Sequence, residues 1–245
     1  MLMRLLEFIL SKRPITKLTD IGKGLFDGYS LKSYSQEGED MILRRLFENQ
    51  LMGFYVDVGA HHPKRFSNTY FFYKKGWRGI NIDAMPNSMR LFKKVRPRDI
   101  NIEKPVSDKK QILTYYIFNE PALNGFSKEL SGKRNGQGGY FVERTENIET
   151  TTLEDILNCN LPINQPIDFL SIDVEGLDFK VLKSNNFDIY RPKVILIEIL
   201  KSCLEDVLKS EVAVYLTKEN YCLYAKSVNT VVFIEPIFYK ERFGE

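Results

Sequence analysis

The ten residues FYVDVGAHHP, from Phe54 to Pro63, decide how the rest of this chain is interpreted. The first five are mostly apolar and predict a buried strand at 54–58, and Gly59 predicts a sharp turn directly after it. A strand followed by a glycine turn is typical of nucleotide-binding α/β domains. A turn that cradles a pyrophosphate needs a GxGxxG pattern, whereas here Gly59 is followed by Ala-His-His-Pro. The stretch therefore favours a cofactor without phosphates over NAD or FAD.

Outward from this stretch, strand and helix patterns alternate along the chain. Strands are expected at 54–58, 79–83, 100–107, 112–118, 168–174 and 194–200. Helices are expected at 35–47, 68–75, 86–95, 151–157, 178–184 and 203–219, and a final hairpin at 221–225 and 230–235. Strands that are buried on both faces and separated by helices predict an α/β fold with a doubly wound, mainly parallel sheet. The hairpin adds an antiparallel strand at or near the edge of that sheet.

The length of 245 residues suits one large domain with an extension. We expect an N-terminal helical extension at 1–50 and the α/β domain at 51–245. Residues 121–148 interrupt the alternation with a polar, Gly-rich stretch, which is commonly a lid or disordered. The apolar start at 1–10 is too short to span a bilayer. It predicts an amphipathic helix packed on its own domain, with peripheral membrane contact as the alternative.

Cysteine usage and charge restrict the class of protein. Three widely spaced cysteines without a CxxC pattern argue against a disulfide framework or zinc site and favour a reducing cytoplasm. The net charge of +3 does not demand nucleic acid as a partner. Between residues 64 and 110, however, thirteen Lys and Arg residues accompany only four acids. This excess predicts solvated helix faces, and the alternative is a positive rim that attracts a phosphate-bearing substrate.

Polar residues at the ends of apolar strands are candidates for a cofactor site, because ligands of open α/β sheets bind at the carboxyl ends of the strands. Asp57 lies within the first strand and can order the turn or accept a hydrogen bond from a ligand's ammonium group. Asp83 ends the second strand and can accept both hydroxyls of an adenosine ribose, the alternative being a surface acid beside a helix start. Ser107 and Asp108 end the third strand, where side chains can contact an adenine edge.

Three further acids and both histidines of the chain are candidates for catalysis. Asp173 and Glu175 alternate with apolar residues at a strand end, where they can act as a general base, hold a divalent cation or cap a helix. Glu198 lies in an apolar strand, where a buried structural hydrogen bond is the alternative. His61 and His62 are adjacent, so their side chains diverge and do not easily chelate one metal. One of them can serve as a base of near-neutral pKa while the other packs.

Several motifs taken together resemble the FkbM family of S-adenosylmethionine-dependent methyltransferases, over about residues 34–234. They are Ser35-Gln36-Glu37-Gly38-Glu39-Asp40, Val56-Asp57-Val58-Gly59-Ala60-His61-His62-Pro63, Ser67-Asn68-Thr69, Gly76-Trp77-Arg78-Gly79-Ile80-Asn81-Ile82-Asp83 and Ile172-Asp173-Val174-Glu175-Gly176. The chain is especially similar to a bacterial branch whose motif reads Gly-Ala-His-His-Pro, followed by Ser-Asn-Thr.

This resemblance implies a class I methyltransferase fold, with seven strands of which the last is antiparallel to the others. It implies O-methylation, typically of sugars in bacterial glycans or of natural products. It also implies roles by position: Asp57 and Gly59 at the methionine end of the cofactor, Asp83 at the ribose, Ser107 or Asp108 near the adenine, Gln36 and Asn68 near its polar groups, and Asp173 facing the methyl-transfer site. His61 and His62 stand where the general pattern has glycines, which moves them towards substrate roles.

The reaction that the resemblance implies is in-line displacement of the methyl group by a hydroxyl oxygen, which needs a base or a metal. We expect Asp173 as the base, with His61 or His62 next. The alternative is a magnesium site of Asp173, Glu175 and Glu198. The acceptor is expected to be a sugar, nucleotide-sugar or glycan, over which residues 121–148 close with their aromatic residues Phe126, Tyr140 and Phe141.

Three other functions remain open from the sequence. A catalytically idle glycan-binding module would have the same sheet, but it would not give the three strand-end acids a catalytic role. An NAD-dependent oxidoreductase also needs an acid at the end of the second strand, but the missing glycines count against it. A nucleic-acid methyltransferase is suggested only by the basic segment at 64–110.

Overall fold

The computed structural model describes residues 29–200 and 202–244. The chain forms two compact units, Met1–Ser33 and Tyr34–Glu245, and every helix and strand described below belongs to the second unit. Most of the expected N-terminal extension, including the apolar start at 1–10, lies outside the described residues. Among the residues described, no helix is both long and apolar enough to cross a membrane.

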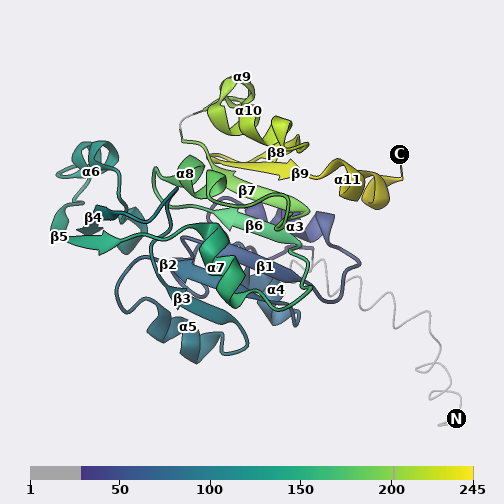
Figure 1. Ribbon diagram of the computed structural model, residues 1–245, viewed down its shortest axis with the longest axis horizontal. Helices are drawn as coiled ribbons and strands as arrows, with labels where there is room; N and C mark the ends of the chain where they lie inside the picture. Colours follow the sequence, from purple (N-terminus) through teal and green to yellow (C-terminus); the bar gives the residue numbers. More distant parts are fainter. Residues whose placement is uncertain (1–28, 201, 245) are drawn as a thin grey trace, which may run out of the picture. The chain divides into compact units, whose positions relative to one another are not determined.

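A seven-stranded sheet forms the centre of the second unit, with strand order β3-β2-β1-β6-β7-β9-β8 (Figure 1). The strands are β1 (Phe54–Val58), β2 (Arg78–Asp83), β3 (Ile100–Glu103), β6 (Phe169–Ile172), β7 (Val194–Glu198), β8 (Cys222–Lys226) and β9 (Thr230–Ile234). Strands β3, β2, β1, β6 and β7 pair in parallel, whereas β9 is antiparallel to both of its neighbours, β7 and β8. This arrangement confirms the predicted fold class and the antiparallel last strand.

Helices cover both faces of the sheet. They are α3 (Glu39–Leu46), α4 (Tyr70–Lys74), α5 (Met89–Val95), α7 (Leu153–Asn160), α8 (Asp178–Lys183), α9 (Leu204–Lys209), α10 (Glu211–Lys218) and α11 (Pro236–Phe243). One core cluster contains residues of α7 to α10 and a second contains residues of α3, α4 and α11. Alternate residues of β1 enter different clusters, Val56 the first and Tyr55 the second, because successive side chains of a strand point to opposite faces. The fully buried β1 thus accounts for its continuous apolar pattern.

Three local expectations differ from the structure. The helix expected at 203–219 is two helices, because Ser210 has extended backbone angles and its hydroxyl caps α10 by accepting from the Ala213 N–H at 3.1 Å. The strand expected at 100–107 ends at Glu103, two residues before a proline. Helix α11 was not predicted, although Pro236 in its first turn is a helix-start signal. By contrast, the helix expected at 151–157 is present, and the Thr152 hydroxyl caps α7 by accepting from the Asp155 N–H at 3.0 Å.

An insertion after β3 folds apart from the seven-stranded sheet. Strands β4 (Ile112–Phe118) and β5 (Val142–Glu149) form their own antiparallel pair. The segment between them, expected as a Gly-rich loop, instead contains the short helix η1 (Pro121–Leu123) and helix α6 (Lys128–Arg134). Figure 1 shows β4, β5 and α6 standing together to the left of the main sheet. We call residues 112–149 the insertion.

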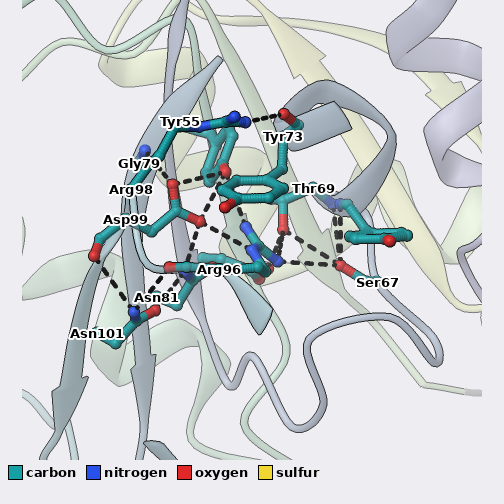
Figure 2. A network of polar contacts seen from close by, with 12 residues as sticks. Tyr55, Ser67, Thr69, Tyr73, Gly79, Asn81, Arg96, Arg98, Asp99 and Asn101 are labelled. Atoms are coloured by element: carbon teal, nitrogen blue, oxygen red, sulfur yellow. Dashed lines mark hydrogen bonds and ion pairs between the residues drawn. The ribbon is translucent and has the colours of Figure 1, made fainter. Parts of the chain in front are cut away.

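A buried polar network ties β1 to the loop before α4 and to the segment that follows α5 (Figure 2). Arg96 is fully buried and donates to four side chains: Asp99 at 2.8 Å, Tyr55 at 2.8 Å, Thr69 at 2.9 Å and Ser67 at 3.5 Å. The Thr69 hydroxyl donates in turn to Asp57 at 2.8 Å. A guanidinium without access to water needs such a set of acceptors, because an unpaired buried charge is very costly. The network therefore holds the loop at 67–69 in place beside β1.

Candidate functional site

A cavity of about 350 Å³ lies at the carboxyl ends of β1, β2, β6 and β7. One side of it consists of strand-end residues: Val58, Gly59, Ile82, Asp83, Asp173 and Glu198. The insertion supplies another wall, which runs from Tyr115 through Glu120–Phe126 to Arg134 and Tyr140. This position is where ligands of open α/β sheets bind. Parallel strands thus bring together acids that lie far apart in the sequence.

A second, smaller cavity of about 30 Å³ adjoins the first and has a mostly polar lining. Gln36, Asp173, Glu198 and Asn229 line both cavities, and Asn68 lines the smaller one. The Asn68 amide donates to the Ser171 hydroxyl at 3.1 Å, which holds it beside β6. The two residues that the sequence places near the polar groups of the cofactor, Gln36 and Asn68, therefore meet at this smaller cavity.

Gly59 makes the turn that separates β1 from the cavity. Its φ of +86° lies in the left-handed region, and a Cβ there would lie 1.6 Å from the carbonyl oxygen of Asp173. The N–H groups of Gly59 and Ala60 both donate to the Ile82 carbonyl, at 2.9 and 3.0 Å. Only glycine allows this contact between the end of β1 and the end of β6. The turn thus packs against the end of β6, and Gly59 and Asp173 both line the cavity.

Asp57 lies beneath the cavity and does not line it. One of its oxygens accepts from Thr69, and burial raises the pKa of its carboxyl group while the nearby Arg96 opposes that shift. The hydrogen bond from Thr69 joins Asp57 to the loop at 67–69, which carries Asn68. The contact of Asp57 with a cofactor stays a prediction.

Asp83 lines the cavity at the end of β2, as its strand-end position predicts. Its carboxylate accepts from the N–H groups of His61 at 2.9 Å and Met85 at 2.8 Å. Burial raises the pKa of Asp83, and these two backbone hydrogen bonds act against the rise. Each carboxylate oxygen has a second lone pair, so Asp83 can still accept from two ligand hydroxyls.

Ser107 and Asp108 do not line the cavity. The Ser107 hydroxyl donates to Asp108 at 3.0 Å, and both side chains accept from Gln111. In their place Lys104, Pro105 and Val106 line the end of the cavity nearest β3. The strand expected to run to residue 107 ends earlier, which turns Ser107 away from the position assigned to it.

The two histidines occupy different environments. His61 lines the cavity, with its Nε2 buried and without a hydrogen-bond partner among the described residues. Burial, followed by the nearby Arg65, lowers the pKa of His61. His62 lies outside the cavity lining, and its Nδ1 accepts from the N–H groups of Lys64 at 3.1 Å and Arg65 at 2.9 Å. His62 therefore holds the turn as a neutral imidazole, and His61 is the histidine that faces the cavity.

Three carboxyl groups converge between the two cavities. Asp173, Asp178 and Glu198 each have one oxygen within 4.8 Å of the others. Asp173 is exposed to the cavity although protein surrounds it, and burial followed by repulsion from Asp178 raises its pKa well above the usual range. Burial and then repulsion from Asp173 likewise raise the pKa of Glu198. One Glu198 oxygen is buried without a hydrogen-bond partner among the described residues.

Asp178 is the member of this cluster that the sequence analysis missed. It occupies the place expected for Glu175 in a magnesium site, and its first-turn position in α8 was the available signal. Its two oxygens already accept from the N–H groups of Val174 at 3.0 Å and Gly176 at 2.9 Å, and burial raises its pKa to about 6. These contacts account for Asp178 but not for Asp173 or Glu198, and the grouping of the three carboxyl groups does not by itself identify a metal ion.

Two ion pairs join the insertion to the turns of the main sheet. Arg134 of α6 lies 2.6 Å from Glu175, and Arg65 lies 3.1 Å from Glu120 at the start of η1. Burial raises the pKa of Glu175, and Arg134 opposes the rise. Glu175 therefore serves as an anchor for α6 in this structure. Sequence patterns did not indicate either pair, because their partners are 41 and 55 residues apart.

Aromatic residues complete the wall opposite the strand ends. Phe66, Tyr115, Phe126 and Tyr140 line the cavity. Two of these, Phe126 and Tyr140, were expected near the acceptor, whereas Phe141 is exposed outside the lining. Tyr115 packs against Phe126 with ring centroids 4.7 Å apart. The cavity thus has carboxylates on one side and aromatic faces on the other.

The strand order, the antiparallel β9 and the cavity at the strand ends define a class I methyltransferase fold. The sequence model of the Methyltransferase FkbM domain matches residues 57–223. This match covers more than half of the chain, so the protein belongs to the FkbM methyltransferase family, whose cofactor is S-adenosylmethionine.

Comparison with solved structures finds a TehB-like SAM-dependent methyltransferase from Corynebacterium glutamicum, at 10% sequence identity and a TM-score of 0.37. The similarity covers 91% of this chain and 99% of that chain. Comparison with curated proteins finds no match for this sequence.

Proposed function

We propose that this protein transfers a methyl group from S-adenosylmethionine to a hydroxyl group of a sugar or glycan precursor. The observation that carries this proposal is the position of Asp173. Asp173 lines the cavity together with Gly59, and its carboxyl group has no ion-pair partner among the described residues. A base at that point can take the proton of a hydroxyl bound in the cavity.

The cavity fits the shape and chemistry of the cofactor. Asp83 offers carboxylate oxygens to the ribose hydroxyls, and the turn at Gly59 lines the cavity where the methionine portion would lie. Gln36 and Asn68 in the smaller cavity offer amide groups to its carboxylate and ammonium ends. The apolar Val106 lines the end where the adenine would lie.

Bound S-adenosylmethionine supplies an electrophilic methyl group. The protein aligns the acceptor hydroxyl and removes its proton, and alignment alone contributes much of the rate. Asp173 is our first choice for the base, because its raised pKa makes the ionised form a stronger base than an exposed aspartate. His61 is the second choice, because it lines the cavity and its buried Nε2 has no hydrogen-bond partner among the described residues.

The wall of the insertion supports a carbohydrate as the acceptor. Phe126 and Tyr140 of the insertion line the cavity, and the apolar face of a sugar ring can pack against aromatic rings. The insertion also covers the strand ends, which limits the access of water to the reacting groups. A catalytically idle glycan-binding protein would use the same aromatic wall, so binding of the cofactor separates the two functions.

Replacing Asp83 by Asn is expected to weaken binding of both S-adenosylmethionine and S-adenosylhomocysteine about tenfold, because hydrogen bonds to a charged acceptor are lost. Isothermal titration calorimetry measures both dissociation constants. The matched control is Glu103→Gln, since Glu103 pairs with Asp83 in the register of β2 and β3 but lies outside the cavity lining. Equal dissociation constants for Asp83→Asn and the wild type would remove Asp83 from the ribose site.

Calorimetry with the wild-type protein tests the proposed function. We expect micromolar binding of S-adenosylmethionine and S-adenosylhomocysteine and no binding of NAD. Absence of binding for both sulfur compounds would contradict the proposal and favour the glycan-binding alternative. Binding of NAD alone would favour an oxidoreductase.

A further inference from the structure

The charges that line the cavity do not match the positive rim considered from the sequence. Of the thirteen basic residues between 64 and 110, only Arg65 and Lys104 line the cavity. Among all the described residues of the lining, five are acids and three are bases. The acids are Asp83, Glu120, Asp173, Glu175 and Glu198, and the bases are Arg65, Lys104 and Arg134. Burial raises the pKa of Asp173 well above its usual range and that of Glu198 to about 10. Even with both of these groups protonated, three acids stand against three bases, so the lining carries no excess of positive charge.

Two of the three bases are already paired with acids of the same lining. Arg134 pairs with Glu175 at 2.6 Å, with both side chains mostly shielded from solvent, and Arg65 pairs with Glu120 at 3.1 Å. The remaining base, Lys104, is exposed and stands beside Pro105 at the end assigned to the adenine. The half of the cavity that faces Asp173 thus contains guanidinium groups, but each is bonded to a glutamate.

A free arginine is well suited to bind phosphate, because its planar guanidinium group donates two parallel hydrogen bonds. Glutamate accepts the same two hydrogen bonds, so an arginine that is paired with glutamate has less to offer a phosphate. The neighbouring carboxyl groups of Asp173 and Glu198, whose pKa values are raised, add no positive charge that could attract a phosphate to the same space. The pairing of the arginines therefore bears on which acceptors can enter.

Building on the proposed function, we propose that Glu120 and Glu175 are specificity residues that keep the acceptor half of the cavity closed to phosphate groups. By occupying Arg65 and Arg134 they select an uncharged sugar or polyol hydroxyl over a phosphorylated or nucleotide-activated sugar. The aromatic wall and the carboxylates suit the C–H faces and hydroxyl groups of such an acceptor. The site would discriminate against a phosphorylated sugar because that competitor would meet an unfavourable contact.

The test measures binding of pyrophosphate and of UDP to protein saturated with S-adenosylhomocysteine. We expect the wild type to bind both probes with dissociation constants above about 1 mM. Glu120→Gln is expected to bind them about tenfold more tightly, because it releases a guanidinium group for a charge-assisted hydrogen bond. The amide oxygen of Gln can still accept from the Ala122 N–H, as Glu120 does at 3.2 Å. The substitution therefore leaves the start of η1 intact.

Two further variants show which arginine is responsible for tighter binding of pyrophosphate or UDP. Glu146→Gln makes the same change and releases Arg144, whose ion pair of 2.9 Å lies on β5 outside the cavity lining. It is expected to bind both probes as weakly as the wild type. The double variant Glu120→Gln/Arg65→Gln is expected to lose the gain, which would identify Arg65 as the freed group.

Two results would overturn the proposal: micromolar binding of pyrophosphate or UDP by the wild type, or an unchanged dissociation constant in Glu120→Gln. Binding of S-adenosylhomocysteine is measured first, and its failure would contradict the proposed function instead. In that case the titration of pyrophosphate into cofactor-free wild type and Glu120→Gln still decides whether Glu120 masks Arg65.

Discussion

Replacing Arg96 by Met is expected to destabilise the fold by about 3–5 kcal/mol, because the fully buried Asp99 loses its only basic partner among the described residues. Arg96 and Asp99 lie 2.8 Å apart, and Tyr55 bonds to both of them (Figure 2). Burial raises the pKa of the Tyr55 hydroxyl well above its usual value, so it remains a neutral donor to Asp99. Urea denaturation of the purified protein measures the free energy of unfolding.

The matched control for this variant is Arg98→Met. Arg98 is exposed two residues further along the chain and donates to the Tyr73 carbonyl. Its loss is expected to cost less than about 1 kcal/mol. An Arg96→Met variant as stable as this control would show that the network contributes little to the fold.

A second variant separates loss of the ion pair from exposure of a bare charge. Arg96→Met combined with Asp99→Asn removes both charges and is expected to recover part of the lost stability. Recovery is incomplete because Asp99 also accepts from Gly79 at 3.1 Å and from Asn81 at 3.0 Å, and an amide has only one oxygen to offer. A double variant less stable than Arg96→Met would contradict this account.

Replacing Asp173 by Asn is expected to lower the rate of methyl transfer about 10²–10⁴-fold, the usual contribution of a positioned general base. Binding of S-adenosylhomocysteine is expected to change little, because the amide fills the same space. The measurement compares initial rates with the first acceptor found among uncharged sugars, together with calorimetry of the cofactor product. The matched control is Asp188→Asn, an exposed aspartate after α8 that lies outside the cavity.

The pH dependence of the reaction rate is a second, independent test of Asp173 as the base. A base acts in its ionised form, so the wild-type rate is expected to rise as the pH increases through the pKa of Asp173. Burial and the neighbouring acids raise that pKa, which places the rise above the range of an exposed aspartate. The Asp173→Asn variant lacks this rise. Should the variant fold, bind the cofactor product and react at the wild-type rate, His61 becomes the candidate base.

Much of the fold follows from sequence patterns that are local. The strand at 54–58 has the predicted bounds in the structure, because five consecutive buried positions leave a continuous apolar pattern. The strand at 112–118 was also predicted with its observed bounds, but its partner was not. It pairs with β5 in a separate sheet, since side-chain alternation indicates a strand without indicating which other strand it joins.

The candidate site, like the fold, could be predicted only in part from the sequence. The sequence placed Asp83 and Asp173 at strand ends, and parallel strands bring such ends to one edge of the sheet. It did not show that Asp57 would point away from the cavity to Thr69, or that Ser107 would turn to Asp108. These outcomes depend on which neighbour satisfies each buried polar group.

The sequence by itself determined the class of fold, the family and the strand-end acids, because each of these depends on patterns among residues that are close together in the sequence. The tertiary structure alone decided that Asp178 joins Asp173 and Glu198, and that two glutamates occupy the arginines of the cavity. Contacts between residues more than forty positions apart depend on how whole elements pack, and the free energy of a buried charge depends on every group around it.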